Sequence, residues 1–260
     1  MKADYHMHTS FSSDSTYPME EEVLRAIEVG LEEICFTDHV DHVASYENSD
    51  LVECRKEYLR LKDKYAGQIQ LKFGVEFGMQ LHTMDLFEKD YHNFDFDFVI
   101  MSCHQIDDKG FWNQEYQEGM NQNEINVSYY EYIYECAKRY KNYSVLGHLD
   151  AIKRDDPFGE YDDQYVLEII KKILKLVIED GKGIEVNTSN FRYNLSDLTP
   201  SRTILKLYYD LGGRILTFGS DSHQKEHVGY KIEEVKKIVK EIGFTHFCTF
   251  EKMKPIYHEL

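Results

Sequence analysis

The chain has 260 residues and a formal net charge of −17, with 42% hydrophobic and 14% aromatic residues. This composition supplies a sizeable core and argues against disorder. The negative net charge disfavours nucleic-acid binding, which depends on Lys and Arg to neutralise phosphates. The chain has no run of eighteen apolar residues, so we expect no membrane span.

Strand and helix patterns alternate along the whole chain. In chain order, we expect a strand at 3–7, a helix at 19–29, a strand at 33–38, a helix at 50–66, a strand at 69–77, a short helix at 81–91, a strand at 95–103, a helix at 124–141, a strand at 144–148, a helix at 163–180, a strand at 183–188, a helix at 201–211, a strand at 215–220, a helix at 231–242 and a last strand at 245–250. Strand–helix repeats without a linker predict one domain over residues 1–260, an α/β barrel of parallel strands with outer helices. The long loops at 105–122 and 153–162 are where we expect substrate to be selected.

The cysteines and the start of the chain indicate a cytoplasmic protein. The five cysteines are odd in number and scattered, which is typical of reduced thiols and not of disulfides or a structural zinc knot. The first residues run directly into a histidine pair, so we expect no cleaved signal peptide.

Histidine or a carboxylate follows most of the predicted strands. The first strand ends in His6-Met7-His8, and side chains two apart on an extended chain face the same side, so both imidazoles can bind one metal ion. Later strands end in the same way, at His39, Glu76, His104, His148, Asp221 and His223, and Asp14 lies in the loop after the first strand. Because a parallel barrel gathers the C-terminal ends of its strands on one face, we expect these side chains to converge.

The remaining residues near these positions have weaker signals. His82, His92, His246 and His258 lie in helical or terminal segments without partners, and we do not expect them to bind metal. Cys103 beside His104 is not expected to be a nucleophile pair, because adjacent strand residues face opposite ways.

A mixture of imidazole and carboxylate without thiolate suits Zn²⁺, Mn²⁺ or Fe²⁺. The candidate ligands are too many for one ion, so we predict two or three ions that share carboxylates. Clustered divalent ions make hydroxide available near neutral pH and stabilise entering and leaving oxygens, which is the chemistry of phosphoester hydrolysis. The chain has no Gly-rich phosphate loop and no Gly-x-Ser-x-Gly elbow.

In their order and spacing these residues resemble the polymerase-and-histidinol-phosphatase (PHP) family of metal hydrolases. The matching stretches are His6-x-His8, Thr37-Asp38-His39, Gly74-Val75-Glu76, Ser102-x-His104, Gly147-His148-x-Asp150 and Gly219-Ser220-Asp221-Ser222-His223. Residues 147–154 and 185–192 resemble the histidinol-phosphatase branch. In the second stretch, Asn190 stands where that branch usually has Gly, and Asn also tolerates left-handed backbone angles.

The resemblance implies a distorted (β/α)7 barrel that holds three metal ions. It assigns the ligands as His6, His8, Glu76 and Asp221 for one ion, Glu76, His104 and His148 for a second, and Asp14, His39 and His223 for the third. Glu76 and Asp221 would thereby also be catalytic residues.

The same resemblance implies hydrolysis of L-histidinol phosphate to L-histidinol and phosphate, a step of histidine biosynthesis, by attack of a hydroxide that bridges two ions. It places Arg154 and Arg192 at the substrate, where a guanidinium can hold phosphate in two-point contact; the alternative for these arginines is a surface salt bridge, for example to Asp155 or Asp156. His42 is a candidate substrate contact or proton donor to the leaving alkoxide. Trp112 either stacks on an imidazole ring or pins its loop to the barrel.

Two other functions stay open. One is a PHP hydrolase of nucleotides or short oligonucleotides, which the acidic charge disfavours. The other is a metal-stabilised structural or regulatory subunit without turnover, which the intact set of candidate ligands disfavours. The expected partner is a small phosphomonoester, with no nucleic acid and no membrane.

Overall fold

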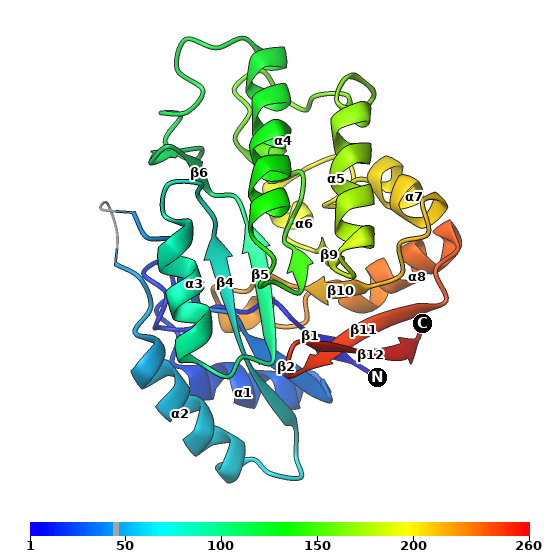
Figure 1. Cartoon of the computed structure of the whole chain (residues 1–260). Coiled ribbons are helices and arrows are strands. Elements are labelled where there is room, and N and C mark those ends of the chain that lie inside the picture. Colours follow the sequence, from blue (N-terminus) through cyan, green and yellow to red (C-terminus); the bar gives the residue numbers. More distant parts are fainter. Residues whose placement is uncertain (44–46) are drawn as a thin grey trace.

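In the computed structural model, which describes residues 1–43 and 47–260, parallel strands form a ring with helices outside it (Figure 1). The order around the ring is β1 (Ala3–Asp4), β2 (Glu33–Phe36), β4 (Gln70–Gly78), β5 (Phe98–Ser102), β8 (Val145–Leu146), β9 (Gly183–Asn187) and β10 (Leu216–Gly219). Backbone bonds between the first and last strands close the ring, with Tyr5 N donating to Phe218 O at 2.9 Å. The predicted distorted seven-stranded barrel is confirmed.

The outer helices agree with the predicted ranges to within four residues. They are α1 (Met19–Glu28), α2 (Leu51–Lys64), α3 (Met84–Asn93), α4 (Gln122–Arg139), α5 (Leu167–Glu179), α7 (Arg202–Asp210) and α8 (Ile232–Ile242). Local structure explains two of the differences. Helix α4 begins two residues early because Asn121 and Glu124 form a reciprocal capping box, and α5 begins late because a 3₁₀ turn occupies Asp163–Tyr165.

The sequence patterns did not predict several short elements. These are β3 (His39–Val40), the hairpin of β6 (Gln105–Ile106) and β7 (Lys109–Gly110), α6 (Asn190–Tyr193), β12 (Lys254–Glu259), and 3₁₀ turns at Ala151–Arg154 and Lys225–His227. The left-handed backbone suggested for Asn190 belongs instead to Asn194, which ends α6 at φ 54°.

The predicted last strand, β11 (His246–Glu251), pairs antiparallel with β12 and does not join the barrel sheet. Its hairpin closes the N-terminal end of the ring: Phe250 N donates to Tyr5 Oη at 2.8 Å, and the Phe250 ring lies 5.0 Å from that of Phe98. The opposite end, where the strands finish, stays open.

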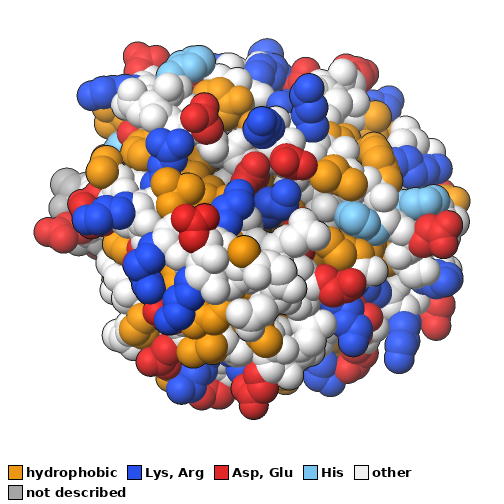
Figure 2. Space-filling view, turned by 90° about the horizontal axis from the view of Figure 1, so that it is seen from below, with side chains coloured by type: hydrophobic (Ala, Val, Ile, Leu, Met, Phe, Trp, Pro, Cys, Tyr) orange, Lys and Arg blue, Asp and Glu red, His pale blue; other side chains and the backbone are white. Residues whose placement is uncertain are grey.

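Figure 2 shows the molecule from below, where acidic and basic side chains are interspersed over the coloured surface. The net negative charge is therefore not gathered into one acidic field on this face. Within residues 1–43 and 47–260, no helix is both long and apolar enough to cross a bilayer.

Glu22 is an unusual feature of α1, because its side chain is fully buried and neither carboxylate oxygen has a hydrogen-bond partner among the described residues. Burial, reinforced by the negative charges of Asp4 and Asp38, raises the pKa of Glu22 to about 8. The folded state therefore holds this proton more tightly than the unfolded chain does.

We expect Glu22→Gln to stabilise the protein at alkaline pH. The parent should lose stability as the pH rises from about 4.5, the ordinary pKa at which the unfolded chain releases the proton, to about 8, where the folded state must release it. The variant should therefore match the parent near pH 4.5 and exceed it by at most about 5 kcal/mol above pH 8. Urea unfolding of the metal-free proteins at pH 5 and pH 9 measures this. Glu28→Gln, on the exposed end of α1, is the control, and parallel curves for Glu22→Gln and the parent would contradict the prediction.

Candidate metal centre

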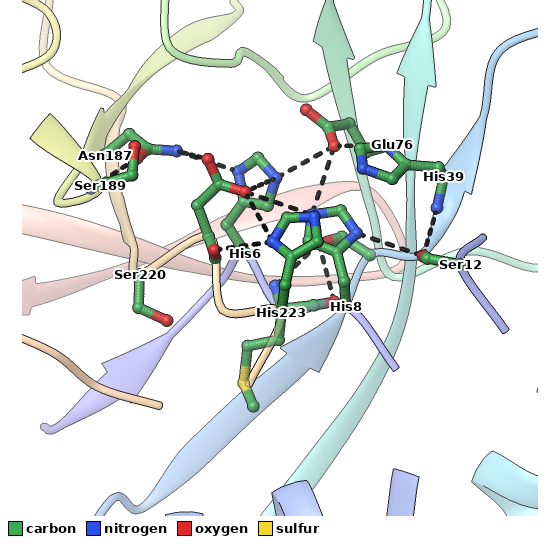
Figure 3. A network of polar contacts seen from close by, with 12 residues as sticks. His6, His8, Ser12, His39, Glu76, Asn187, Ser189, Ser220 and His223 are labelled. Atoms are coloured by element: carbon green, nitrogen blue, oxygen red, sulfur yellow. Dashed lines mark hydrogen bonds and ion pairs between the residues drawn. The ribbon is translucent and has the colours of Figure 1, made fainter. Parts of the chain in front are cut away.

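The open end of the barrel gathers histidines from distant parts of the chain (Figure 3). Their rings lie within contact distance of one another: the centroids of His8 and His39 are 4.1 Å apart, those of His8 and His223 are 4.2 Å apart, and those of His6 and His148 are 5.6 Å apart. His104 adjoins the same group, 5.1 Å from His39. Because each of these residues follows or begins a strand, the barrel brings them together as expected.

Glu76, in β4, lies at the centre of this cluster and is completely buried. Its two carboxylate oxygens are within 3.6 Å of five imidazoles, at 2.9 Å from His148, 3.0 Å from His39, 3.1 Å from His6, 3.2 Å from His104 and 3.5 Å from His8. Asp221 is next to it, with Oδ1 at 3.4 Å from His8 Nε2. Two carboxylates thus face a shell of imidazole nitrogens.

The cluster has the polar atoms that a metal ion requires. Four buried atoms at its centre have no hydrogen-bond partner in the described chain, namely His6 Nε2, His8 Nε2, His39 Nδ1 and Glu76 Oε2. Buried polar atoms without partners are costly, and so many in one place is unusual. A divalent cation would satisfy these lone pairs together, and nitrogen with carboxylate oxygen is a donor set that Zn²⁺, Mn²⁺ and Fe²⁺ accept.

Four sets of ligand atoms lie close enough together to hold an ion. The sets overlap and are His6–His8–Glu76, His8–His39–His223, His6–His148–Asp221 and His39–Glu76–His104. The first agrees with the ion expected at the His6–His8 pair. Each of the other sets keeps two residues of an expected group, namely His39 and His223, His6 and Asp221, or Glu76 and His104. The assignment of ligands to individual ions stays a prediction.

Asp14 belongs to none of these sets but lies at their edge. Its Oδ2 is 3.0 Å from His223 Nε2 and 3.4 Å from His39 Nε2, and its side chain is half exposed. The preceding part of its loop is fixed by the buried Asp38, which accepts hydrogen bonds from Thr9 N at 2.7 Å and Ser12 Oγ at 2.7 Å. All nine candidate ligands therefore lie in one neighbourhood.

The electrostatics of the cluster favour metal binding. Burial alone would raise the pKa of Glu76 and of Asp221, but the imidazoles around them, His6 first, lower both well below the usual range. Burial and the neighbouring imidazoles His39 and His223 lower the pKa of His8 far below its usual value. The same carboxylates act in the opposite direction on other rings: Glu185 and Glu76 raise the pKa of His6, Glu76 and Asp14 raise that of His39, and Asp41 and Glu76 raise that of His104 to about 9. Without a metal ion these imidazoles therefore supply the positive charge that the buried carboxylates need, and a divalent cation would take over that role as it displaces their protons.

Two buried carboxylates outside the cluster orient its histidines. Glu185, in β9, is 2.6 Å from His6 Nδ1 and also accepts the His148 backbone N–H at 2.9 Å. Asp41 is 2.7 Å from His104 Nδ1. With Nδ1–H donated outwards, the Nε2 lone pair of each ring faces Glu76, an arrangement common among metal-bound histidines.

Sequence reasoning did not give Glu185 or Asp41 these roles. The available signal was weak: one is an acidic residue within an otherwise apolar strand, and the other lies two residues after a candidate ligand. A neighbouring glycine makes room for each. A Cβ on Gly219 would overlap Glu185 Oε1, and one on Gly78 would overlap Asp41 Oδ1.

A cavity of about 360 Å³ opens above the cluster, and Arg154 and Trp112 line it. Arg154 Nη2 is 3.3 Å from Asp221 Oδ2 and 2.6 Å from Ser189 Oγ, so it does not make the surface salt bridge considered as the alternative. Trp112 is 67% exposed, which argues against its pinning the loop. A second cavity, of about 280 Å³, adjoins the first and is lined by Arg192.

Both arginines keep a free donor beside the cluster. Arg192 Nη2 donates to the Asp221 carbonyl oxygen at 2.7 Å, which holds its guanidinium in place. Arg192 Nη1 and Arg154 Nε are buried and lack a hydrogen-bond partner within the part of the chain that is described. Arg154 lines the first cavity and Arg192 the second, so an anion held there would lie beside both side chains.

His42 is not part of this site, which corrects the expectation that it contacts substrate or protonates the leaving group. Its Nε2 is 2.7 Å from Asp90 and its Nδ1 is 3.2 Å from Asn48, so both ring nitrogens are occupied. It lines a separate groove between α2 and α3. The backbone explains this, because His42 has a left-handed φ of 52°, which turns its side chain away from the barrel mouth.

The four histidines not expected to bind metal also lie elsewhere, although each has a partner. His82 pairs with Asp108, His92 with Glu88, His246 with Thr245 and His258 with Thr249. Cys103 is buried, and burial raises the pKa of its thiol well above the usual value, so it is a poor nucleophile, as expected.

Comparison with known proteins gives concordant results. The family model described as PHP domain matches residues 4–189. Histidinol-phosphatase of Lactococcus lactis is 32% identical over 97% of this chain and 96% of its own length, and a Thermotoga maritima protein named "Probable histidinol-phosphatase" is 29% identical over 94% of each. The crystal structure of the Lactococcus lactis histidinol phosphate phosphatase in complex with Zn, L-histidinol and phosphate has a TM-score of 0.90, with 30% identity over 98% of both chains.

We expect Glu76→Ala to lose bound metal and activity together, because it removes the carboxylate that the imidazoles share. Metal per chain after dialysis and phosphate release from a phosphomonoester are the measurements. Glu118→Ala, on an exposed side chain, is the matched control. Full metal occupancy in Glu76→Ala would show that this carboxylate is not a shared ligand.

Glu185→Ala should weaken zinc binding by about 10- to 100-fold, since His6 loses the acceptor that orients it. Glu185→Gln should retain part of the affinity, because an amide oxygen can still accept the His6 Nδ1–H. Competition with a chromogenic chelator measures both, and excess zinc should restore activity. Equal affinities in the parent and both variants would exclude an orienting role.

Proposed function

This chain belongs to the PHP domain family, and from that membership we propose that it is a metal-dependent phosphatase that hydrolyses L-histidinol phosphate to L-histidinol and phosphate. The observation that carries the proposal is the convergence, at one barrel mouth, of unpartnered imidazole and carboxylate atoms with two arginines that keep a free donor. The Lactococcus lactis enzyme, whose structure holds Zn, L-histidinol and phosphate, shares the fold over nearly the whole chain. The reaction belongs to histidine biosynthesis.

We propose that the metal ligands are His6, His8, Asp14, His39, Glu76, His104, His148, Asp221 and His223. The resident group is two or three divalent ions. Such ions polarise phosphate oxygens and lower the pKa of water, which makes a nucleophile available near neutral pH. Glu76 supports this chemistry, because a buried carboxylate shared by five imidazoles fixes the ligand atoms before substrate arrives.

Arg154 and Arg192 bind the phosphate in this proposal. Both are anchored through Asp221, one at its carboxylate and the other at its backbone carbonyl, so the two guanidinium groups flank the metal ligands. Anchoring reduces the conformational freedom that binding would otherwise remove. The free Nε of Arg154 and Nη1 of Arg192 then donate to non-bridging phosphate oxygens, whose charge they stabilise during hydrolysis.

The whole chain serves this one site. We propose that residues 1–260 are a single domain, because ligands extend from residue 6 to residue 223 and the C-terminal hairpin closes the other end of the same barrel. The cavity above the cluster, at about 360 Å³, suits a small molecule and not a polymer groove.

The substrate itself is tested by a panel. Purified protein with zinc or manganese should release phosphate from L-histidinol phosphate with a kcat/KM at least about tenfold above that for adenosine monophosphate, and should not cleave a bis-p-nitrophenyl ester at a comparable rate. A preference for adenosine monophosphate or the diester would favour nucleotide or oligonucleotide hydrolysis. Release no faster than in the metal-free control would indicate a subunit without turnover.

Arg192→Ala should raise KM for L-histidinol phosphate by about 10- to 100-fold, the value of a charged hydrogen bond, and leave metal content intact. Arg192→Lys should recover only part of the loss, because Lys lacks the planar fork. The control is Arg139→Ala, an exposed arginine at the end of α4. Unchanged kinetics in Arg192→Ala would remove Arg192 from the substrate site.

A further inference from the structure

Four aspartates line the cavity above the cluster, and one of them differs from the rest. Asp14, Asp41 and Asp221 each lie within 3.4 Å of an imidazole nitrogen of the cluster. The fourth, Asp155, has no hydrogen bond or ion pair through its carboxylate in residues 1–43 and 47–260, although it is partly buried. A carboxylate that faces a cavity without a partner is available to a ligand.

The neighbouring Arg154 does not neutralise Asp155 directly. Its guanidinium turns towards Asp221 and Ser189 and lies 4.7 Å from the ring of Tyr193. Burial raises the pKa of Asp155, and the charge of Arg154 only partly opposes this. An ionised carboxylate in this position is therefore stabilised by a cation that enters the cavity.

The backbone of Asp155 is held firmly. Its carbonyl oxygen accepts the side-chain amides of Gln114 at 2.8 Å and Gln117 at 3.0 Å. The same two amides donate to the carbonyl oxygen of Phe111, at 3.3 Å and 3.0 Å. These bonds join the loop that carries Trp112 to the turn that carries Arg154, so the carboxylate and the aromatic wall of the cavity keep a fixed relation.

The proposed substrate has opposite charges at its two ends. The phosphate matches the metal ligands and the arginines, but the ammonium group three bonds away from the ester oxygen needs a negative partner outside the metal cluster. Resting on the proposed function, we propose that Asp155 binds the ammonium group of L-histidinol phosphate and so selects this substrate among phosphomonoesters. Asp155 follows Arg154 directly in the chain. A group that binds the cationic end of a small zwitterion thus lies beside a group that binds its anionic end.

The test pairs a charge removed from the enzyme with a charge removed from the substrate. Asp155→Asn should lower kcat/KM for L-histidinol phosphate by about 10- to 100-fold, mainly through KM. For the analogue without the amine, 3-(imidazol-4-yl)propyl phosphate, the same variant should change kcat/KM by less than about twofold. Asp155→Glu should recover part of the preference. Glu115→Gln, an exposed charge in the adjoining loop, should leave both substrates unaffected.

The outcomes separate this inference from the proposed function. If the parent prefers L-histidinol phosphate but Asp155→Asn lowers kcat/KM equally for both substrates, Asp155 has a structural role and the inference is wrong. If the parent shows no preference for L-histidinol phosphate over adenosine monophosphate, the proposed function fails first. Zinc content and melting temperature of each variant show whether the fold and the metal centre are retained. If Asp155→Asn loses either, Asp155→Glu decides. That variant must weaken selectivity for the amine if the inference is right.

Discussion

A buried carboxylate surrounded by imidazoles is the feature on which the site depends. Glu76 is fully enclosed, and five ring nitrogens lie within 3.6 Å of its oxygens. An anion in such an interior requires compensating positive charge. Neutral imidazoles cannot supply it, and protonated ones could not use their lone pairs. Divalent ions resolve both requirements, since they neutralise the carboxylate and occupy the nitrogen lone pairs that lack partners.

The barrel topology lowers the conformational entropy that must be lost to form this arrangement. Parallel strands end on one face, so side chains at positions 6, 76, 148 and 221 become neighbours without long loops that would have to be ordered separately. The other end of the ring is closed by the β11–β12 hairpin through Tyr5, Phe98 and Phe250. Polar chemistry and apolar packing are thus separated along the barrel axis.

Around the cluster, a second group of polar residues orients the candidate ligands and the two arginines. Glu185 and Asp41 receive the outward ring nitrogens of His6 and His104, and Asp221 anchors both arginines. Each of these carboxylates has a defined partner, and Asp155 stands out because it has none in the described chain. The site is therefore pre-organised at its phosphate end and keeps a free charge at its outer end.

The sequence by itself determined the fold class and the candidate ligands. Strand–helix periodicity and residues at strand ends are local signals, and the parallel topology converts them into one face, as it does for His8, Glu76 and His223. Tertiary structure decided the rest. His42 faces Asp90 because its left-handed backbone turns it outwards, Glu185 acts on a histidine 179 positions away, and β11 leaves the barrel to pair with β12. Side-chain direction depends on backbone angles and on distant neighbours, and neither can be read from a residue's own surroundings in the sequence.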